Sequence, residues 1–109
     1  MNTKPSPDVP PETVFTASRW TQGNLLFPTK IVISPNRVSR VKGRLFGSNE
    51  ETIPMSKVAS VHISTSMIWS EILIESVGGA DPITSHGHRK KDAQRIRDLI
   101  ETYQAQSRS

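Results

Sequence analysis

Several segments of this chain alternate apolar and polar residues, which is the pattern of a β-strand with one buried face. In "TKIVIS", Ile31 and Ile33 share one side, and in "WSEILIESV", Ile72 and Ile74 do the same. Successive side chains of a strand point to opposite faces of a sheet. The alternation therefore predicts strands with two distinct faces, and the isoleucine face of residues 69–77 is one candidate for the buried face.

Turn-forming residues separate the alternating segments and set the number of strands. "SPNR", "GSNEE" and "GGAD" contain the Pro, Asn, Gly and Asp residues that favour tight turns. A single helical turn is expected at "MSK", after Pro54. The expected strands are residues 13–20, 29–34, 37–46, 51–54, 58–66, 69–77 and 82–86.

The period of the apolar residues changes after Gly87. A stripe at helical spacing predicts an amphipathic helix over about residues 88–104 and is formed by Ala93, Ile96, Leu99, Ile100 and Tyr103. The proline-rich residues 1–12 are expected to be a disordered lead, and residues 105–109 a disordered tail. We expect one mainly β domain over residues 13–104: a seven-stranded antiparallel barrel, or two crossed sheets, capped by the helix.

Composition narrows the classes of function. The chain has no cysteine and a net charge of +4, with most of the positive excess from Gly87 onward. No run approaches the roughly 18 apolar residues of a membrane span. We therefore expect a soluble, cytoplasmic protein, without nucleic acid, cofactor or small-molecule substrate as a partner.

The amino-acid sequence of the central segment resembles that of a known protein family. "PTKIVISPNRVSRVKGRLFGSNEETIPMSKVASVHIS" is similar to bacterial pleckstrin-homology-like domains, and the likeness extends over about residues 13–104. It implies a pleckstrin-homology-like fold and a noncatalytic module that mediates protein contacts or self-association. The residues that match the family pattern are Ile31, Ile33, Arg37, Val38, Lys42, Gly43, Ile53, Pro54, Val58, Val61, Ile72 and Ile74.

Two basic clusters are candidate anion sites. In the first, Arg40, Lys42 and Arg44 share one face of the third strand, where three cations in a row suit a phosphate or a lipid headgroup. The alternative is a solvated face whose charges are balanced by Glu71 and Glu75 on the sixth expected strand, or by Glu50 and Glu51 nearby. If the basic residues do bind, the protein is expected at the periphery of an anionic membrane.

The second cluster surrounds the start of the helix. Helix amino termini favour anions, whereas cations there oppose the helix dipole, so an exposed polar turn is the alternative to a binding site. His86 and His88 form an HxH pair without a third ligand nearby, and no metal site is predicted. The candidate residues are His88, Arg89, Lys90 and Lys91.

No catalytic motif accompanies these clusters, so an enzyme is not predicted. His62 shares a strand face with Ser60 and Ser64 but has no acidic residue in a triad pattern. Trp69 and Leu73 lie opposite the Ile72 and Ile74 face, so they are interface candidates, with core packing of Trp69 as the alternative.

Overall fold

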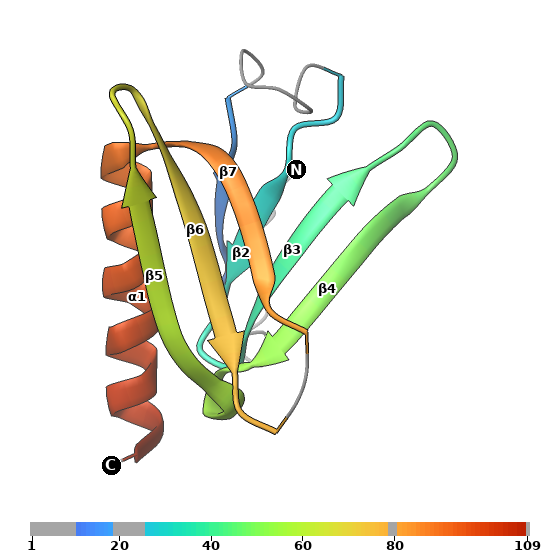
Figure 1. Ribbon diagram of the computed structural model, residues 1–109. Helices are drawn as coiled ribbons and strands as arrows, with labels where there is room; N and C mark the ends of the chain where they lie inside the picture. Colours follow the sequence, from blue (N-terminus) through green and yellow to red (C-terminus); the bar gives the residue numbers. More distant parts are fainter. Residues whose placement is uncertain (1–10, 19–25, 79–80, 109) are drawn as a thin grey trace, which may run out of the picture.

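A computed structural model describes residues 11–18, 26–78 and 81–108 of the 109-residue chain (Figure 1). Strands come first and a long helix comes last, in the order expected from the sequence. The elements are β1 (Thr13–Thr16), β2 (Lys30–Ile33), β3 (Arg37–Gly43), β4 (Ser48–Pro54), the 3-10 turn η1 (Met55–Lys57), β5 (Val58–Thr65), β6 (Trp69–Ser76), β7 (Ile83–Arg89) and α1 (Lys90–Arg108).

The strands form two antiparallel sheets, ordered β1-β2-β3-β4 and β5-β6-β7. This confirms the two-sheet form of the prediction, and the barrel alternative is wrong. The chain changes sheet at η1, where the Met55 amide donates to the Asn36 carbonyl at 2.8 Å, so β4 and β5 separate instead of pairing. The Ser18 amide donates to the Gly87 carbonyl at 2.9 Å, and this bond links the segment after β1 of the four-stranded sheet to β7 of the three-stranded sheet.

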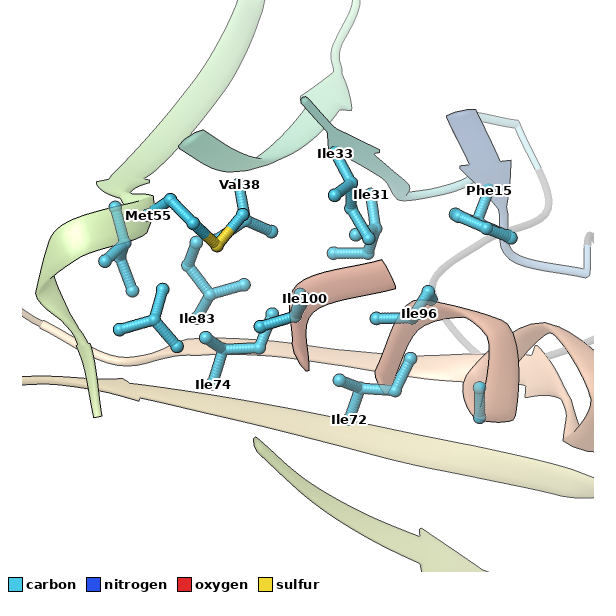
Figure 2. Packing of buried hydrophobic residues seen from close by; sticks show 13 residues of the cluster. Phe15, Ile31, Ile33, Val38, Met55, Ile72, Ile74, Ile83, Ile96 and Ile100 are labelled. Atoms are coloured by element: carbon cyan, nitrogen blue, oxygen red, sulfur yellow. The ribbon is translucent and has the colours of Figure 1, made fainter. Parts of the chain in front are cut away.

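The core lies between the two sheets and the helix (Figure 2). Figure 2 shows isoleucines from β2, β6, β7 and α1 pointing toward one another, with Met55 at one end of the cluster and Phe15 at the other. The alternation predicted for β2 and β6 is confirmed, because the isoleucine faces of both strands are fully buried. The buried cluster comprises Phe15, Ile31, Ile33, Val38, Ile53, Met55, Val58, Ile72, Ile74, Ile83, Ala93, Ile96 and Ile100.

The helix begins later and continues further than expected. His88 and Arg89 belong to β7, because they pair with Ser70 and Trp69 of β6. At its other end α1 continues to Arg108, since no glycine or proline interrupts residues 104–108, and the tail expected from residue 105 is helical up to that point. The side chain of residue 104 also donates to the carbonyl of residue 58 at 2.8 Å and fastens this end of α1 to the start of β5.

The hairpin of β3 and β4 differs most from the prediction. β3 ends at Gly43 instead of continuing to residue 46, and β4 begins at Ser48 instead of residue 51. A turn over residues 44–47 joins them: the Arg44 amide donates to the Gly47 carbonyl at 3.0 Å, and Gly47 adopts a φ of 98°. The glycine permits this conformation, which other residues rarely adopt.

The first strand is shorter than expected. β1 ends at Thr16, and residues 19–20 of the predicted strand lie outside the described residues. In the part of the chain that the structure describes, α1 and η1 are the helical elements, and neither is long and apolar enough to cross a membrane.

Candidate functional site

The β3–β4 hairpin projects from the body of the molecule (Figure 1). The turn at its end carries two exposed apolar side chains. We call residues 41–50 the arm. Leu45 is 79% exposed and Phe46 is 86% exposed, in a turn held by the backbone bond from Arg44 to Gly47. Large apolar side chains that stand this far in water are typical of contact sites when they occur together.

Two further segments at the same end of the molecule expose apolar residues. The β5–β6 turn carries Met67 and Ile68, and the segment before β2 carries Leu26. In Figure 1 the β5–β6 turn, the arm and the start of α1 all lie at the upper end. Exposed apolar side chains are therefore concentrated at one end of the molecule, on several separate segments.

The predicted basic face on β3 is divided by local contacts. Arg40 donates to the Glu51 carboxylate at 2.9 Å, and Lys42 donates to the Phe27 carbonyl at 2.8 Å. Partial burial, and to a smaller degree Arg40, lower the pKa of the Lys42 ammonium. Arg44 lies beyond the strand and is exposed. Opposite charge from β4 thus balances part of the face, as the alternative predicted.

Lys42 and Phe27 also connect the arm to the segment before β2. The Phe27 ring lies against Gly43, where a Cβ atom would meet the ring Cδ1 at 3.3 Å. A side chain at residue 43 would therefore displace the ring. The missing Cβ and the lysine bond together set the direction in which the arm leaves the sheet.

The cluster at the helix start contains one buried and three exposed members. Arg89, Lys90 and Lys91 are exposed, whereas His88 is fully buried and forms a 2.6 Å hydrogen bond between its Nε2 and the Ser85 hydroxyl. Burial lowers the pKa of His88 to about 4, opposed by Asp92 and reinforced by His86. His88 is therefore neutral at pH 7 and contributes no charge to an anion at this end.

A hollow lies between the β5–β6 hairpin and the end of β7. Its volume is about 350 Å³, and it is lined by residues 64–66, 69–71 and 86–87. Trp69 is half-buried and forms part of the wall, while Glu71 is exposed beside it. The pairing of β6 with β7 shifts register between Ser70 and Ile72, next to residues that line the hollow. The hollow combines an aromatic wall with one carboxylate.

Leu73 lies on the same outer face of β6 and is half-buried. The burial pattern of β6 places Ser70, Ile72 and Ile74 inside and leaves Trp69 and Leu73 outside the core. Of the two alternatives for Trp69, the structure supports the outer face, although the side chain is only partly accessible.

His62 joins Ser60 and Glu75 in an exposed cluster that cannot act as a catalytic triad. Its Nε2 lies 2.8 Å from Glu75 Oε1 and 3.2 Å from the Ser60 hydroxyl, and that hydroxyl donates to the same carboxylate oxygen at 3.1 Å. In a triad the serine and the acid bind opposite nitrogens of the imidazole. Here both partners meet one nitrogen, so the ring cannot accept the hydroxyl proton on one nitrogen while the carboxylate orients it through the other.

Within the described ranges, no group of three or more His, Asp or Glu side chains could hold a metal ion. The arm is the main feature that the sequence does not predict, because the pattern of "RVSRVKGRLF" favours one continuous strand. The signal that identifies it is the pair of glycines, Gly43 and Gly47, that bracket "RLF". Glycines at that spacing favour a turn over a continued strand.

Comparison with protein-family models, with curated proteins and with solved structures returns no match for this chain. The resemblance to pleckstrin-homology-like domains thus stays a prediction from the sequence.

Proposed function

We propose that this protein is a noncatalytic assembly module that works by protein–protein contact, including self-association, through the arm. The observation that supports the proposal is the exposure of Leu45 and Phe46 at the end of a projecting hairpin. Burying an apolar side chain of this size stabilises by roughly 1.5–3 kcal/mol relative to leaving it in water. A partner that covers both residues recovers that free energy.

The noncatalytic part of the proposal is supported by the positions of the titratable groups. The Ser85–His88 pair is buried, and the His62 cluster has the wrong arrangement for nucleophilic catalysis. At the hollow near Trp69, the hydroxyls of Thr65 and Ser70 lie 3.3 Å apart and bond to each other. These hydroxyls are therefore paired with each other and not with a general base.

Size-exclusion chromatography with light scattering, over a range of protein concentrations, tests the proposal. The wild-type protein is expected to exceed the 12.1 kDa of one chain as concentration rises. The double variant Leu45→Ser, Phe46→Ser is expected to remain at that mass. Val77→Ser is the matched control, because Val77 is also exposed but lies in a different turn. A wild-type protein that stays monomeric at every concentration would contradict the proposal.

A second candidate function is binding to an anionic membrane surface. Cationic side chains beside apolar ones favour an anionic interface. One end of the molecule exposes both kinds, namely Arg44, Arg89, Lys90 and Lys91 together with Leu45, Phe46, Met67 and Ile68.

Sedimentation with phosphatidylcholine vesicles, with and without phosphatidylserine, tests this second candidate. Lys90→Gln with Lys91→Gln should weaken vesicle binding and leave self-association unchanged, because both lysines lie on α1 and not on the arm. Equal sedimentation with both vesicle types at low salt would exclude the candidate.

A further inference from the structure

The arm carries exposed apolar side chains and the hollow offers space for one, and the two features lie on different sides of the molecule. The arm ends in Leu45 and Phe46, while the hollow offers the side of Trp69 and a volume of about 350 Å³. A cavity of roughly 150 Å³ is enough to accept a benzene ring. The hollow can therefore accept the ring of Phe46.

A chain cannot fill its own hollow with its own arm. Figure 1 shows the arm leading away from the three-stranded sheet, on the far side of the molecule from the β5–β6 hairpin. The contact has to be made between two copies. An apolar projection that fits a hollow elsewhere on the same chain produces a head-to-tail association.

Charge at the two features favours the same contact. Arg44 is exposed at the base of the turn that carries Phe46, and Glu71 is exposed at the hollow. Arg89 pairs with Trp69 across β6 and β7 and is exposed, but it is not one of the residues that line the hollow. The arm carries Glu50 behind its tip. Glu71 is the acidic residue of the hollow's lining and Arg44 is the cation of the arm's turn, so these two opposite charges can meet when Phe46 is inserted.

We propose that the hollow beside Trp69 is the docking site for the arm of a second copy of this chain, with Phe46 inserted and Arg44 facing Glu71. The inference rests on the proposed self-association and adds the surface that receives the arm. Phe46 becomes the anchor of the contact, and Trp69 forms the wall against which it packs. Aromatic anchors of this kind dominate the binding free energy of many interfaces.

Crosslinking between single-cysteine variants tests the pairing, because the chain has no cysteine of its own. Leu45→Cys leaves Phe46 in place, and Ser64→Cys puts a thiol at the hollow. When the two variants carry tags of different mass and are oxidised together, the mixed dimer that joins position 45 to position 64 is expected to predominate. Lys57→Cys is the matched control, since Lys57 is exposed in η1 and should give no mixed dimer above the background.

Each other outcome overturns the inference in a different way. A predominance of dimers between two Leu45→Cys chains would place two arm tips together, and a predominance of dimers between two Ser64→Cys chains would place two sheet faces together. Both results would keep self-association and refute the hollow as the docking site. A protein that stays monomeric by light scattering refutes the proposed function itself. An arm that binds vesicles and no second copy would refute the inference and assign the arm to a membrane.

Substitutions at exposed positions provide a second test that does not depend on crosslinking. Phe46→Ser should weaken self-association by at least about tenfold, because the burial of one aromatic side chain is lost. Arg44→Glu and Glu71→Arg should each weaken it several-fold, and the two together should restore it. Failure of the double charge reversal to recover any affinity would show that these residues do not face each other.

Discussion

The buried His88 predicts how the stability of the fold depends on pH. Its side chain is fully buried, hydrogen-bonded to Ser85, and has a pKa lowered to about 4 by burial. In the unfolded chain the pKa of a histidine returns to about 6.5. Between these two values the unfolded state binds a proton that the folded state does not, so acid favours unfolding.

The magnitude follows from the two pKa values of His88. Each unit of difference between the folded and unfolded pKa values corresponds to about 1.4 kcal/mol of unfolding free energy, so the whole difference amounts to about 3 kcal/mol. This stability is fully present above pH 6.5 and is lost as the pH falls toward 4. At pH 5 about 2 kcal/mol should already be lost.

Urea unfolding followed by tryptophan fluorescence, from pH 7.5 to pH 4, measures the effect against a matched variant. In His88→Gln the amide can keep a hydrogen bond to Ser85 without titrating. The free energy of unfolding of the wild-type protein, minus that of the variant, should fall by about 3 kcal/mol across this range. His86→Gln, on the exposed side of the same strand, is the control. A difference that stays constant across the window would refute the reasoning.

Three further predictions concern the two faces of β6, the charges at the base of the arm and the turn at its tip. Ile72→Ala should lower the free energy of unfolding in urea by about 2–5 kcal/mol, and Leu73→Ala should lower it much less, because only Ile72 of these two is fully buried. Equal losses would mean that the buried face of β6 is wrongly assigned. A double-mutant cycle on Arg40 and Glu51 should give a coupling free energy of about 0.5–1 kcal/mol that decreases in high salt, because the ion pair is partly exposed. A coupling free energy that does not change with salt would contradict this ion pair. Gly47→Ala should destabilise by about 1 kcal/mol or more although nothing crowds the site, since its φ is 98°, and an unchanged midpoint of unfolding would argue against that turn.

The alternation of apolar and polar residues predicts which side chains share a strand face, and long-range packing does not alter this. Ile31 shares a face with Ile33, and Ile72 shares a face with Ile74, as the alternation predicts, and the structure buries both faces. The alternation does not distinguish a closed barrel from two separate sheets. It depends on how the chain turns at η1, which is set by tertiary contacts such as the bond between the backbones of residues 55 and 36.

The candidate site was less predictable, since it depends on exposure and direction. A basic stripe can be identified from spacing alone, but the ion pair of Arg40 with Glu51 and the bond from Lys42 to Phe27 exist only in the folded register. His88 was placed at a solvent-facing helix start because the sequence does not show where β7 ends.

The arm was missed for a similar reason. Leu45 continues the apolar pattern of a strand, and only the folded turn exposes it. The bracketing glycines were the available signal, and they indicate a turn without showing how far it projects.

Paramagnetic relaxation between two copies of the chain tests the central claim most directly. A spin label on Ser48→Cys lies next to the tip of the arm and leaves Leu45 and Phe46 intact. In a mixture with isotope-labelled wild-type protein, signals from residues 64–66, 69–71 and 86–87 of the labelled copy should broaden, and those of η1 should not. Broadening at η1 or at residues 58–61 of β5 instead, or no broadening at concentrations where the protein self-associates, would contradict the account.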